Sequence, residues 1–345
     1  MGRYLVTGGA GFVGSHAVLA LLDGGHEVVV LDNLRQGHRA AVPPGVRLVV
    51  ADLGDADRVD AALADGPYDA VLHFAALSLV GESMAQPFRY LLENAVHGIR
   101  LIEACVRRGV PRFVLSSTAN LFGASGDGPI HEGSPIDPGS PYGESKLMVE
   151  RALRWADECC GLRSACLRYF NAAGADPQGR AGEDHDPETH LIPLVIDAAL
   201  GRRPEIAVFG TDYPTPDGTC IRDYIHVADL ADAHLRALGA LARGSVTYNL
   251  GTGRGNSVME VIRSVERVTG RPVPVRLADR RPGDPAVLVA ASDRLQRETG
   301  WTPRFTQLDD IVRTAARWRE AHPHGYGDRP GAAAPAPRER VGAAE

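Results

Sequence analysis

Lysine is almost absent from this sequence. Of its 37 basic residues, Lys146 is the one lysine and the other 36 are arginines. It lies in the stretch SPYGESKLMVE (140–150), four residues after Tyr142. A chain that uses arginine at every other basic position has little compositional reason to place an ammonium group there. This scarcity marks the pair as a candidate functional site.

The sequence also lacks features that are typical of several other protein classes. Its net charge is −6 and it has no basic block, which argues against a nucleic-acid partner. It has no basic, apolar leader and no apolar run of roughly 18 to 20 residues, so we expect a cytoplasmic protein without a membrane partner. An odd number of cysteines without C-x-x-C spacing predicts reduced, mostly buried thiols, and neither a disulfide framework nor a zinc site. These are Cys105, Cys159, Cys160, Cys166 and Cys220.

Apolar, β-branched runs alternate with segments long enough for a helix through residues 1–170. The runs are RYLVTG, HEVVVLD, VRLVVADL, DAVLHFAA, RFVLSST and RSACLRYF. Continuous apolar runs are typical of strands that are buried on both faces. Their alternation with helices favours right-handed crossovers. The pattern therefore predicts an α/β fold with a Rossmann-type, doubly wound parallel sheet.

The alternation stops after residue 170. Residues 171–190 and 210–223 are rich in Gly, Pro and Asp, and long loops of this kind in a compact chain are commonly functional. We expect residues 1–170 to form one domain, rejoined by about 222–252. Residues 171–327 should mainly form a smaller C-terminal lobe over the carboxyl ends of the strands. The Ala/Pro-rich residues 328–345 lack periodic apolar positions, which predicts a disordered tail.

A glycine-rich loop follows the first predicted strand. In LVTGGAGFVGSH, Gly8, Gly11 and Gly14 stand three apart at the entrance to a predicted helix. Without side chains, the backbone can approach a pyrophosphate, whose charge then lies at the positive end of the helix. Asp32 ends the second strand, where a carboxylate binds ribose hydroxyls and repels a 2′-phosphate. The pattern predicts an NAD site, in which Asp52, at the end of the third strand, is expected to bond the adenine edge.

Tyr142 and Lys146 are predicted to share one face of a helix that begins after Ser140 and ends at Gly161. An ammonium group beside a phenol favours the phenolate and lowers the pKa of the tyrosine. The broad guanidinium of arginine places charge less compactly. Thr118 ends the fifth strand, where its hydroxyl can bond the reacting group. We therefore expect Thr118, Tyr142 and Lys146 to be catalytic, with Tyr142 as the base.

From residue 1 to about 328 the chain resembles the extended short-chain dehydrogenase/reductase family. The motifs that carry the resemblance include VTGGAGFVGSH, SPYGESKLMVE, LRYFNAAGA, FGTDYPTPDGTCIRDYIHV and RRPGD. Within that family it is similar to the enzymes that invert C4 of UDP-hexoses such as UDP-glucose and UDP-galactose. The resemblance implies an NAD-dependent isomerase that works through a transient 4-keto sugar, and a homodimer that pairs helices into a bundle. The first domain would then bind NAD and the smaller lobe the UDP-sugar.

The resemblance also implies the remaining site residues, and it implies no metal. For the cofactor they are Phe12, Val13, Asn33, Leu53, Phe74, Ala75, Ala76, Tyr169 and Phe170. For the UDP-sugar they are Thr118, Asn171, His190, Leu191, Ala207, Phe209, Arg222, Arg281, Asp284 and Leu288. In this set Arg222, Arg281 and Asp284 would hold the diphosphate and the uridine ribose, and Phe209 would contact the uracil. An arginine fork suits a phosphate group.

Several positions depart from the family pattern. Leu77 stands near the usual place of a lysine, which predicts weaker NAD binding. Ala95 replaces a cofactor-facing asparagine, with Asn94 adjacent and a one-residue difference in length. His190 replaces an asparagine beside the diphosphate. Leu288 is intermediate between the large residue that excludes 2-acetamido sugars and the small one that admits them.

Other functions stay open. One is C4 epimerisation of UDP-GlcNAc and UDP-GalNAc, of UDP-glucuronate or of a UDP-pentose. Dehydration and decarboxylation are disfavoured, because Ala119 and Asn120 stand where those reactions need an acid/base pair. A different class is an NAD-binding regulatory protein without turnover. Such a protein would have no reason to keep Thr118, Tyr142 and Lys146 together.

Overall fold

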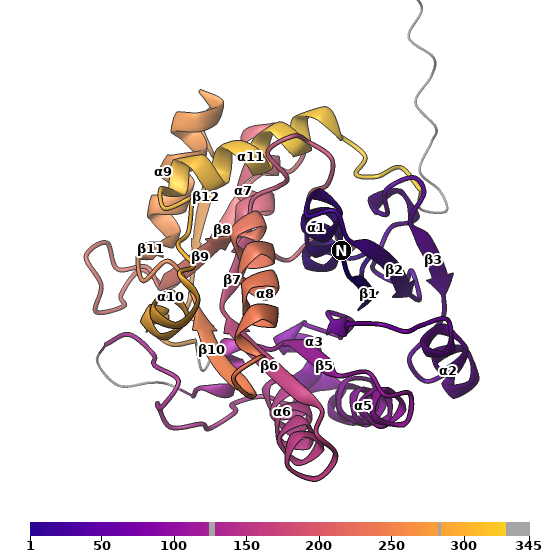
Figure 1. Ribbon diagram of the computed structural model, residues 1–345. Coiled ribbons are helices and arrows are strands. Elements are labelled where there is room, and N and C mark those ends of the chain that lie inside the picture. The colour runs from indigo at the N-terminus through magenta and orange to yellow at the C-terminus, as the bar shows by residue number, and fades with distance from the viewer. Residues whose placement is uncertain (124–127, 282–283, 329–345) are drawn as a thin grey trace, which may run out of the picture.

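We describe the protein from a computed structural model, which covers residues 1–123, 128–281 and 284–328. Its main element is a sheet of seven parallel strands in the order β10-β6-β5-β4-β1-β2-β3 (Figure 1). The strands are β1 (Arg3–Thr7), β2 (Glu27–Asp32), β3 (Arg47–Val50), β4 (Ala70–His73), β5 (Arg112–Ser116), β6 (Arg163–Tyr169) and β10 (Val246–Leu250). The strand order reverses between β1 and β4, where dinucleotides bind in such sheets. The predicted Rossmann-type fold is confirmed.

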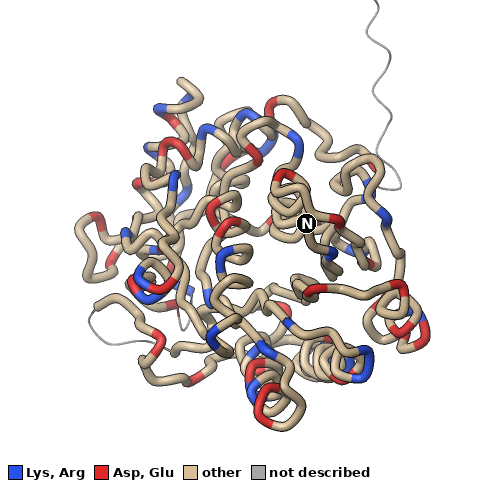
Figure 2. Tube along the Cα trace, in the orientation of Figure 1, with Lys and Arg blue, Asp and Glu red and all other residues tan. Residues whose placement is uncertain are grey.

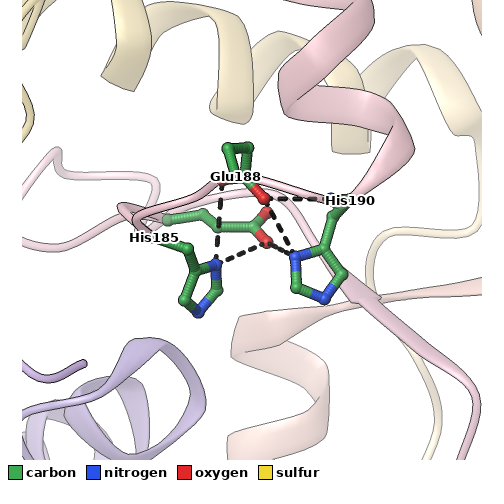
Figure 3. Close-up of side chains that lie close together, drawn as sticks. His185, Glu188 and His190 are labelled. Carbon is green, nitrogen blue, oxygen red and sulfur yellow. Dashed lines mark hydrogen bonds and ion pairs between the residues drawn. The ribbon is translucent and has the colours of Figure 1, made fainter. Parts of the chain in front are cut away.

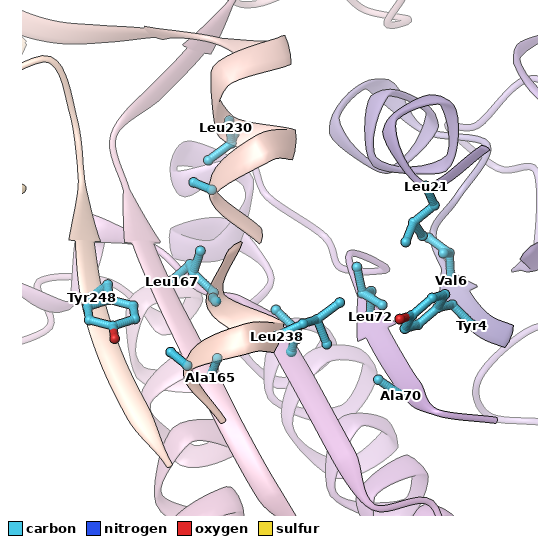
Figure 4. Packing of buried hydrophobic residues seen from close by; sticks show 14 of the residues in the cluster. Tyr4, Val6, Leu21, Ala70, Leu72, Ala165, Leu167, Leu230, Leu238 and Tyr248 are labelled. Atoms are coloured by element: carbon cyan, nitrogen blue, oxygen red, sulfur yellow. The ribbon is translucent and has the colours of Figure 1, made fainter. Parts of the chain in front are cut away.

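Helices cover both faces of this sheet, which explains the continuous apolar runs. Leu5 and Val6 are neighbours on β1, so they point to opposite faces, and each is fully buried in a different core cluster. Figure 4 shows the cluster around Val6, to which Leu72, Leu230 and Leu238 also belong. The helices on that face are α1 (Phe12–Asp23) and α8 (Val227–Ala240). On the other face lie α2 (Ala56–Ala64), α5 (His97–Arg107) and α6 (Pro141–Cys160).

A smaller lobe is built from the rest of the chain. One of its sheets contains β7 (Asn171–Ala173), β9 (Ile221–His226), β11 (Gly255–Ser257) and β13 (Val287–Leu288). The other pairs β8 (Ile206–Phe209) with β12 (Val275–Ala278). Their apolar faces pack against α7 (Leu191–Ala199), α9 (Val258–Thr269) and α11 (Leu308–Ala321). In Figure 1 this lobe lies at the upper left, beside α8.

Short helices complete the connections. They are η1 (Arg39–Ala41), α3 (Val80–Ala85), α4 (Pro87–Tyr90), η2 (Leu91–Val96), η3 (Ala119–Leu121) and α10 (Asp293–Thr299). Figure 2 shows acidic and basic residues interspersed over the trace, as expected for a chain without a basic block.

The chain crosses between the two parts more than once. Within 222–252, β10 is an edge strand of the large sheet and α8 packs on that sheet, whereas β9 is a strand of the small sheet. The division into 1–170 and 171–327 stays a prediction. Asp328, where we placed the start of the tail, accepts a hydrogen bond from His38 at 2.6 Å. Residues 329–345 lie outside the described part of the chain.

Candidate active site

The glycine loop packs so closely that side chains would not fit. Gly8 has a positive φ of 72°, which glycine adopts without strain. A Cβ there would collide with the backbone of Phe74 and Ala75, and one on Gly14 with the carbonyl of Gly8. Gly11 precedes the first residue of α1, so the free N–H groups of the helix open onto this loop. The loop fits the predicted pyrophosphate cradle.

Asp32 supports the same loop from the end of β2. Its carboxylate accepts the backbone N–H groups of Ala10 at 3.0 Å and Leu34 at 2.8 Å. Burial raises the pKa of Asp32, although these two hydrogen bonds oppose the shift. A carboxylate has about four acceptor positions, so Asp32 keeps capacity for the ribose hydroxyls that we expect it to bind.

Asn33 and Asp52 meet at the ends of β2 and β3. The Asn33 amide donates to Asp52 Oδ2 at 2.8 Å, and the N–H of Gly54 donates to Oδ1 at 2.8 Å. Burial alone would raise the pKa of Asp52, but these bonds and nearby Arg35 lower it. Leu53, the residue between Asp52 and Gly54, is partly buried. A surface pocket beside them is lined by Leu34, Arg35, Gly37, His38, Arg39, Asp186 and Asp328.

The loop after β4 is fixed by backbone and side-chain bonds. The N–H groups of Phe74 and Ala75 both donate to the Thr7 carbonyl, at 2.8 and 3.1 Å. Ala76 continues this loop, and Asn94 bonds both backbone groups of Leu77, at 2.8 and 2.9 Å.

Asn94 lies on η2, a π-helix whose hydrogen bonds join residues i and i+5. It is buried, and its amide also donates to Ser145 on α6 at 3.1 Å. Asn94 rather than Ala95 makes the polar contacts with the loop.

The predicted catalytic helix is α6. Ser140 caps it by accepting the N–H of Gly143 at 3.1 Å, and Gly161 ends it at a φ of 75°. Tyr142 and Lys146 are both buried on this helix, and Thr118 is near enough to Tyr142 to lower the pKa of its hydroxyl. The structure thus brings the three predicted catalytic residues together, where β5 and α6 meet.

The sequence predicts a lowered pKa for Tyr142, but its pKa is raised. Burial is the main cause, and the hydrogen bond to Thr118 opposes it. The Lys146 ammonium donates to the Ser116 carbonyl at 2.9 Å instead of pairing with the phenol. Burial also lowers the pKa of Lys146, to about 8, although Glu150 opposes this shift. In the protein alone, desolvation outweighs the expected effect of the ammonium on the phenol.

A buried ion pair that the sequence did not single out lies one turn beyond Lys146. Glu150 contacts Arg168 on β6 at 2.5 Å, and both side chains are 7% exposed. Ser117 donates a hydrogen bond to the same carboxylate, also at 2.5 Å. This pair joins α6 to the sheet and holds a negative charge near the Lys146 ammonium.

Aromatic side chains at the end of β6 lie beside Lys146 and its partners. Tyr169 shares a hydrogen bond of 2.7 Å with Ser116, the residue whose carbonyl holds Lys146. His234 packs beside the rings of Phe74 and Tyr169, at centroid distances of 4.9 and 6.3 Å. Sequence reasoning missed His234, because a lone histidine within an amphipathic helix carries no distinctive signal.

Phe170 and Leu288 pack against one small cluster of Ala119, Phe122 and Ile130. Leu288 also pairs with Arg222 across β13 and β9. The structure therefore places the predicted selectivity residue close to the segment that follows Thr118.

The predicted UDP-binding residues form two contacts in the smaller lobe. Arg222 makes an ion pair with Asp284, and the guanidinium of Arg281 lies 4.1 Å from the centre of the Phe209 ring. Two further members of this predicted set are Asn171, whose amide donates to the Asp223 carbonyl, and Ala207 in β8.

His190 precedes Leu191 at the start of α7, but its Nδ1 is already engaged. It lies 2.9 Å from Glu183 and 3.0 Å from Glu188. Burial opposes protonation of His190, but the two carboxylates raise its pKa to about 10. The predicted contact with a diphosphate would therefore have to use the rest of the ring.

The fold and the glycine loop together define a Rossmann-type, dinucleotide-dependent enzyme. The chain belongs to the NAD dependent epimerase/dehydratase family, whose model matches residues 4–251. It is 52% identical over 321 residues to a UDP-glucose 4-epimerase of Azospirillum brasilense, covering 92% of each chain.

Solved structures agree with this assignment. The UDP-glucose 4-epimerase from Brucella ovis in complex with NAD has a TM-score of 0.89 and 44% identity, covering 92% of this chain and 98% of that one. The UDP-Glc/GlcNAc 4-epimerase from Campylobacter jejuni has a TM-score of 0.82 and 40% identity, covering 93% and 100%. The predicted family, an NAD-dependent epimerase, and its cofactor are confirmed.

The structure also gives the state of the cysteines and bears on membrane-spanning helices. All five cysteines are free thiols, of which Cys159 and Cys160 are exposed and the other three buried. Within the described ranges, we find no helix long and apolar enough to span a bilayer.

Proposed function

We propose that this chain interconverts UDP-glucose and UDP-galactose by inverting C4 of the hexose through a transient 4-keto sugar. The observation that carries the proposal is that Thr118, Tyr142 and Lys146 are all buried where β5 and α6 meet, with Lys146 one helical turn from Tyr142. This group follows β5, at the sheet edge where the loops after β1 and β4 also lie. Relatives that cover most of the chain carry the same activity in their names.

In this reaction Tyr142 takes the proton of the sugar 4-hydroxyl. NAD, when bound, supplies the hydride acceptor and a positively charged ring. Because burial raises the pKa of Tyr142, the phenol depends on nearby positive charge to act as a base, and the Lys146 ammonium on the same helix contributes to it. Thr118, whose side chain lowers the pKa of Tyr142, is placed to bond the reacting hydroxyl. The 4-keto sugar then rotates in the site, C4 takes the hydride back on its other face, and Tyr142 returns the proton to the 4-oxygen.

The protein side chains fit a bound dinucleotide. The crowded backbone at Gly8 and Gly14 leaves a side-chain-free cradle at the start of α1 for the pyrophosphate. We assign the adenosine ribose to Asp32, and the adenine edge to Asp52. In the smaller lobe, we assign the diphosphate and uridine of the substrate to the Arg222–Asp284 and Arg281–Phe209 contacts.

Tyr142→Phe is the direct test of this function. It removes the base and should lower turnover by about 10²- to 10⁴-fold, while NAD measured in the purified protein stays at the wild-type level. Tyr4→Phe is the matched control, because both tyrosines are 8% exposed. A near-normal rate in Tyr142→Phe would refute the proposal.

Substrate choice is tested by separate incubations with UDP-galactose, UDP-GalNAc and UDP-galacturonate. We expect the C4 epimer of UDP-galactose to form fastest. Leu288 packs against the cluster of Ala119, Phe122 and Ile130, and its intermediate size supports a second candidate, a UDP-GlcNAc/UDP-GalNAc epimerase. Such an enzyme would turn over the acetamido sugar at a similar rate. Bound NAD without conversion of any of these sugars would favour the regulatory alternative.

We also propose a homodimer that pairs η2, α5 and α6 with the same helices of a second copy. Leu92, Val96 and Ile99 follow helical spacing on η2 and α5, and Met148 and Trp155 follow it on α6. All five are exposed large apolar residues, and such patches are rare on monomers. Trp155→Glu should shift the sedimentation coefficient from that of a dimer to that of a monomer. Leu277→Glu, an exposed position on β12, is the control, and a monomeric wild type would exclude the dimer.

A cytoplasmic location and a place in galactose metabolism follow as further proposals. The five free thiols support the first, since reducing compartments preserve them. The proposed interconversion of the two UDP-hexoses supports the second.

A further inference from the structure

Four side chains converge in the segment between β7 and α7. They are Glu183, His185, Glu188 and His190, and one donor atom from each lies within 4.8 Å of the others. Figure 3 shows the rings of His185 and His190 turned toward the same small volume as the Glu188 carboxylate. We call these four residues the His/Glu cluster.

The separations in the cluster match those around a single ion. His190 Nδ1 lies 2.9 Å from Glu183 Oε1 and 3.0 Å from Glu188 Oε1. His185 Nδ1 lies 3.4 Å from Glu183 Oε1 and 3.7 Å from Glu188 Oε2. Four ligands at about 2.1 Å from a tetrahedral ion would be about 3.4 Å apart. The observed distances lie on both sides of that value.

Ion pairing within the cluster leaves several buried atoms without hydrogen bonds. Among the described residues, Glu183 Oε1, His185 Nδ1 and Glu188 Oε2 have no hydrogen-bond partner. The Glu183 side chain is 6% exposed, and a buried polar atom without a hydrogen bond costs about 1–3 kcal/mol. His190 Nδ1 and Glu188 Oε1 do form a bond. Each of these atoms lies in an ion pair, and a cation at the centre would replace these pairs with direct coordination bonds.

The surroundings can accommodate a cation. Arg319 lies 3.9 Å from Glu188, but its own ion pair with Asp197 offsets its charge. The His185 ring packs edge-on against Phe12 at the start of α1, with centroids 6.2 Å apart. The His190 side chain is 44% exposed, which provides the entry path that a metal site needs.

We propose that the His/Glu cluster binds one divalent transition-metal ion of the Zn²⁺ type. Two imidazole nitrogens and two carboxylate oxygens are donors that Zn²⁺ takes in tetrahedral sites. The two carboxylates also balance the charge of the ion. Because protein side chains fill all four positions, the ion is structural. It fixes the segment 183–190 between the glycine-loop helix α1 and the start of α7.

The test measures metal binding, so its outcome is independent of epimerase activity. The full-length protein is dialysed against a chelator and titrated with Co²⁺, whose visible absorption reports tetrahedral coordination. We expect one equivalent to bind, Zn²⁺ to displace it, and the melting temperature to rise with Zn²⁺. His185→Gln should weaken Zn²⁺ binding by more than the roughly 10- to 100-fold that loss of a supporting group costs.

The control is His324→Gln, which removes an exposed histidine outside the cluster and should leave binding unchanged. Wild-type protein that binds no Co²⁺ or Zn²⁺ would overturn the proposal, and so would unchanged binding in a folded His185→Gln variant. If that variant does not fold, wild-type crystals grown with Zn²⁺ decide. An anomalous peak among the four side chains supports the site, and its absence there excludes it.

Discussion

The large sheet and the smaller lobe hold their functional residues in different ways. In the sheet, Thr118, Tyr142 and Lys146 lie on or directly after regular elements whose packing leaves them little freedom. In the lobe, the Arg222 guanidinium on β9 bonds Asp284 and the Ile221 carbonyl. Arg281 contacts the Phe209 ring. The difference suggests that the sheet determines the chemistry, while the lobe tunes how the substrate is held. Changes in the sheet should therefore reduce turnover or stability strongly, and changes in the lobe should mainly alter KM.

The largest effect is expected at Lys146. Lys146→Met removes the ammonium group next to Ser116 and should reduce turnover by about 10²- to 10⁴-fold. Lys146→Arg keeps the charge but not its compact shape, so we expect it to be slow as well. Steady-state kinetics with UDP-galactose measures both, with circular dichroism to check folding. Full activity in Lys146→Met would show that the phenol acts without its cationic neighbour.

The next effect concerns the buried pair of Glu150 and Arg168. Glu150→Gln leaves the guanidinium buried without a counter-charge and should lower the free energy of unfolding by about 3–5 kcal/mol. Replacing both residues with leucine should cost less, because no charge is then buried. Urea denaturation measures both variants. Asp232→Ala, which breaks an exposed pair with Arg236, is the control and should cost about 0.3–0.5 kcal/mol. A similar small loss in Glu150→Gln would contradict the prediction.

Three buried histidines make the stability of the protein depend on pH. Burial lowers the pKa of His73 and His226 to about 3 and that of His234 to about 4. Below about pH 6.5 the unfolded chain therefore binds more protons than the folded one. Their contribution to stability is complete above that pH and is lost progressively as the pH falls toward 3–4, by about 1.4 kcal/mol per pH unit for each proton.

His234→Leu tests this dependence. It should reduce the slope of unfolding free energy against pH by about one proton between pH 6 and 5, as measured by urea denaturation. His324→Leu, at an exposed position, should leave the slope unchanged. An unaltered slope in His234→Leu would mean that this imidazole is not held neutral.

The smallest effect is expected in the lobe. Phe209→Leu removes the ring under the Arg281 guanidinium, a contact worth about 0.5–1 kcal/mol at exposed sites. The KM for UDP-galactose should rise about 2- to 5-fold, with kcat unchanged. Tyr213→Leu removes an equivalent contact with Arg280, also at 4.1 Å, and serves as the control outside the predicted site. A fall in kcat with constant KM would place Phe209 in the chemistry instead.

The helix that carries Tyr142 and Lys146 shows how much of this site could be predicted. Its cap at Ser140, its end at Gly161 and its buried face all follow from local sequence signals. The predicted direction of the Tyr142 pKa shift was wrong, because burial and the position of the Lys146 ammonium depend on strands that are distant in sequence. The segment EDHDPETH shows a second limit. Its E-x-H-x-x-E-x-H pattern can be read from the sequence, but cysteine spacing, on which the prediction of no zinc site rests, carries no information about it.

By itself, the sequence determined the parallel sheet, the glycine loop and the helix that carries Tyr142 and Lys146, because strand patterns, glycine spacing and caps are local properties. Only the tertiary structure decided that Asn94 reaches the loop after β4, that Arg168 neutralises Glu150 and that two histidines meet two glutamates. These contacts join residues through packing and desolvation, which depend on the whole fold rather than on any short stretch of chain.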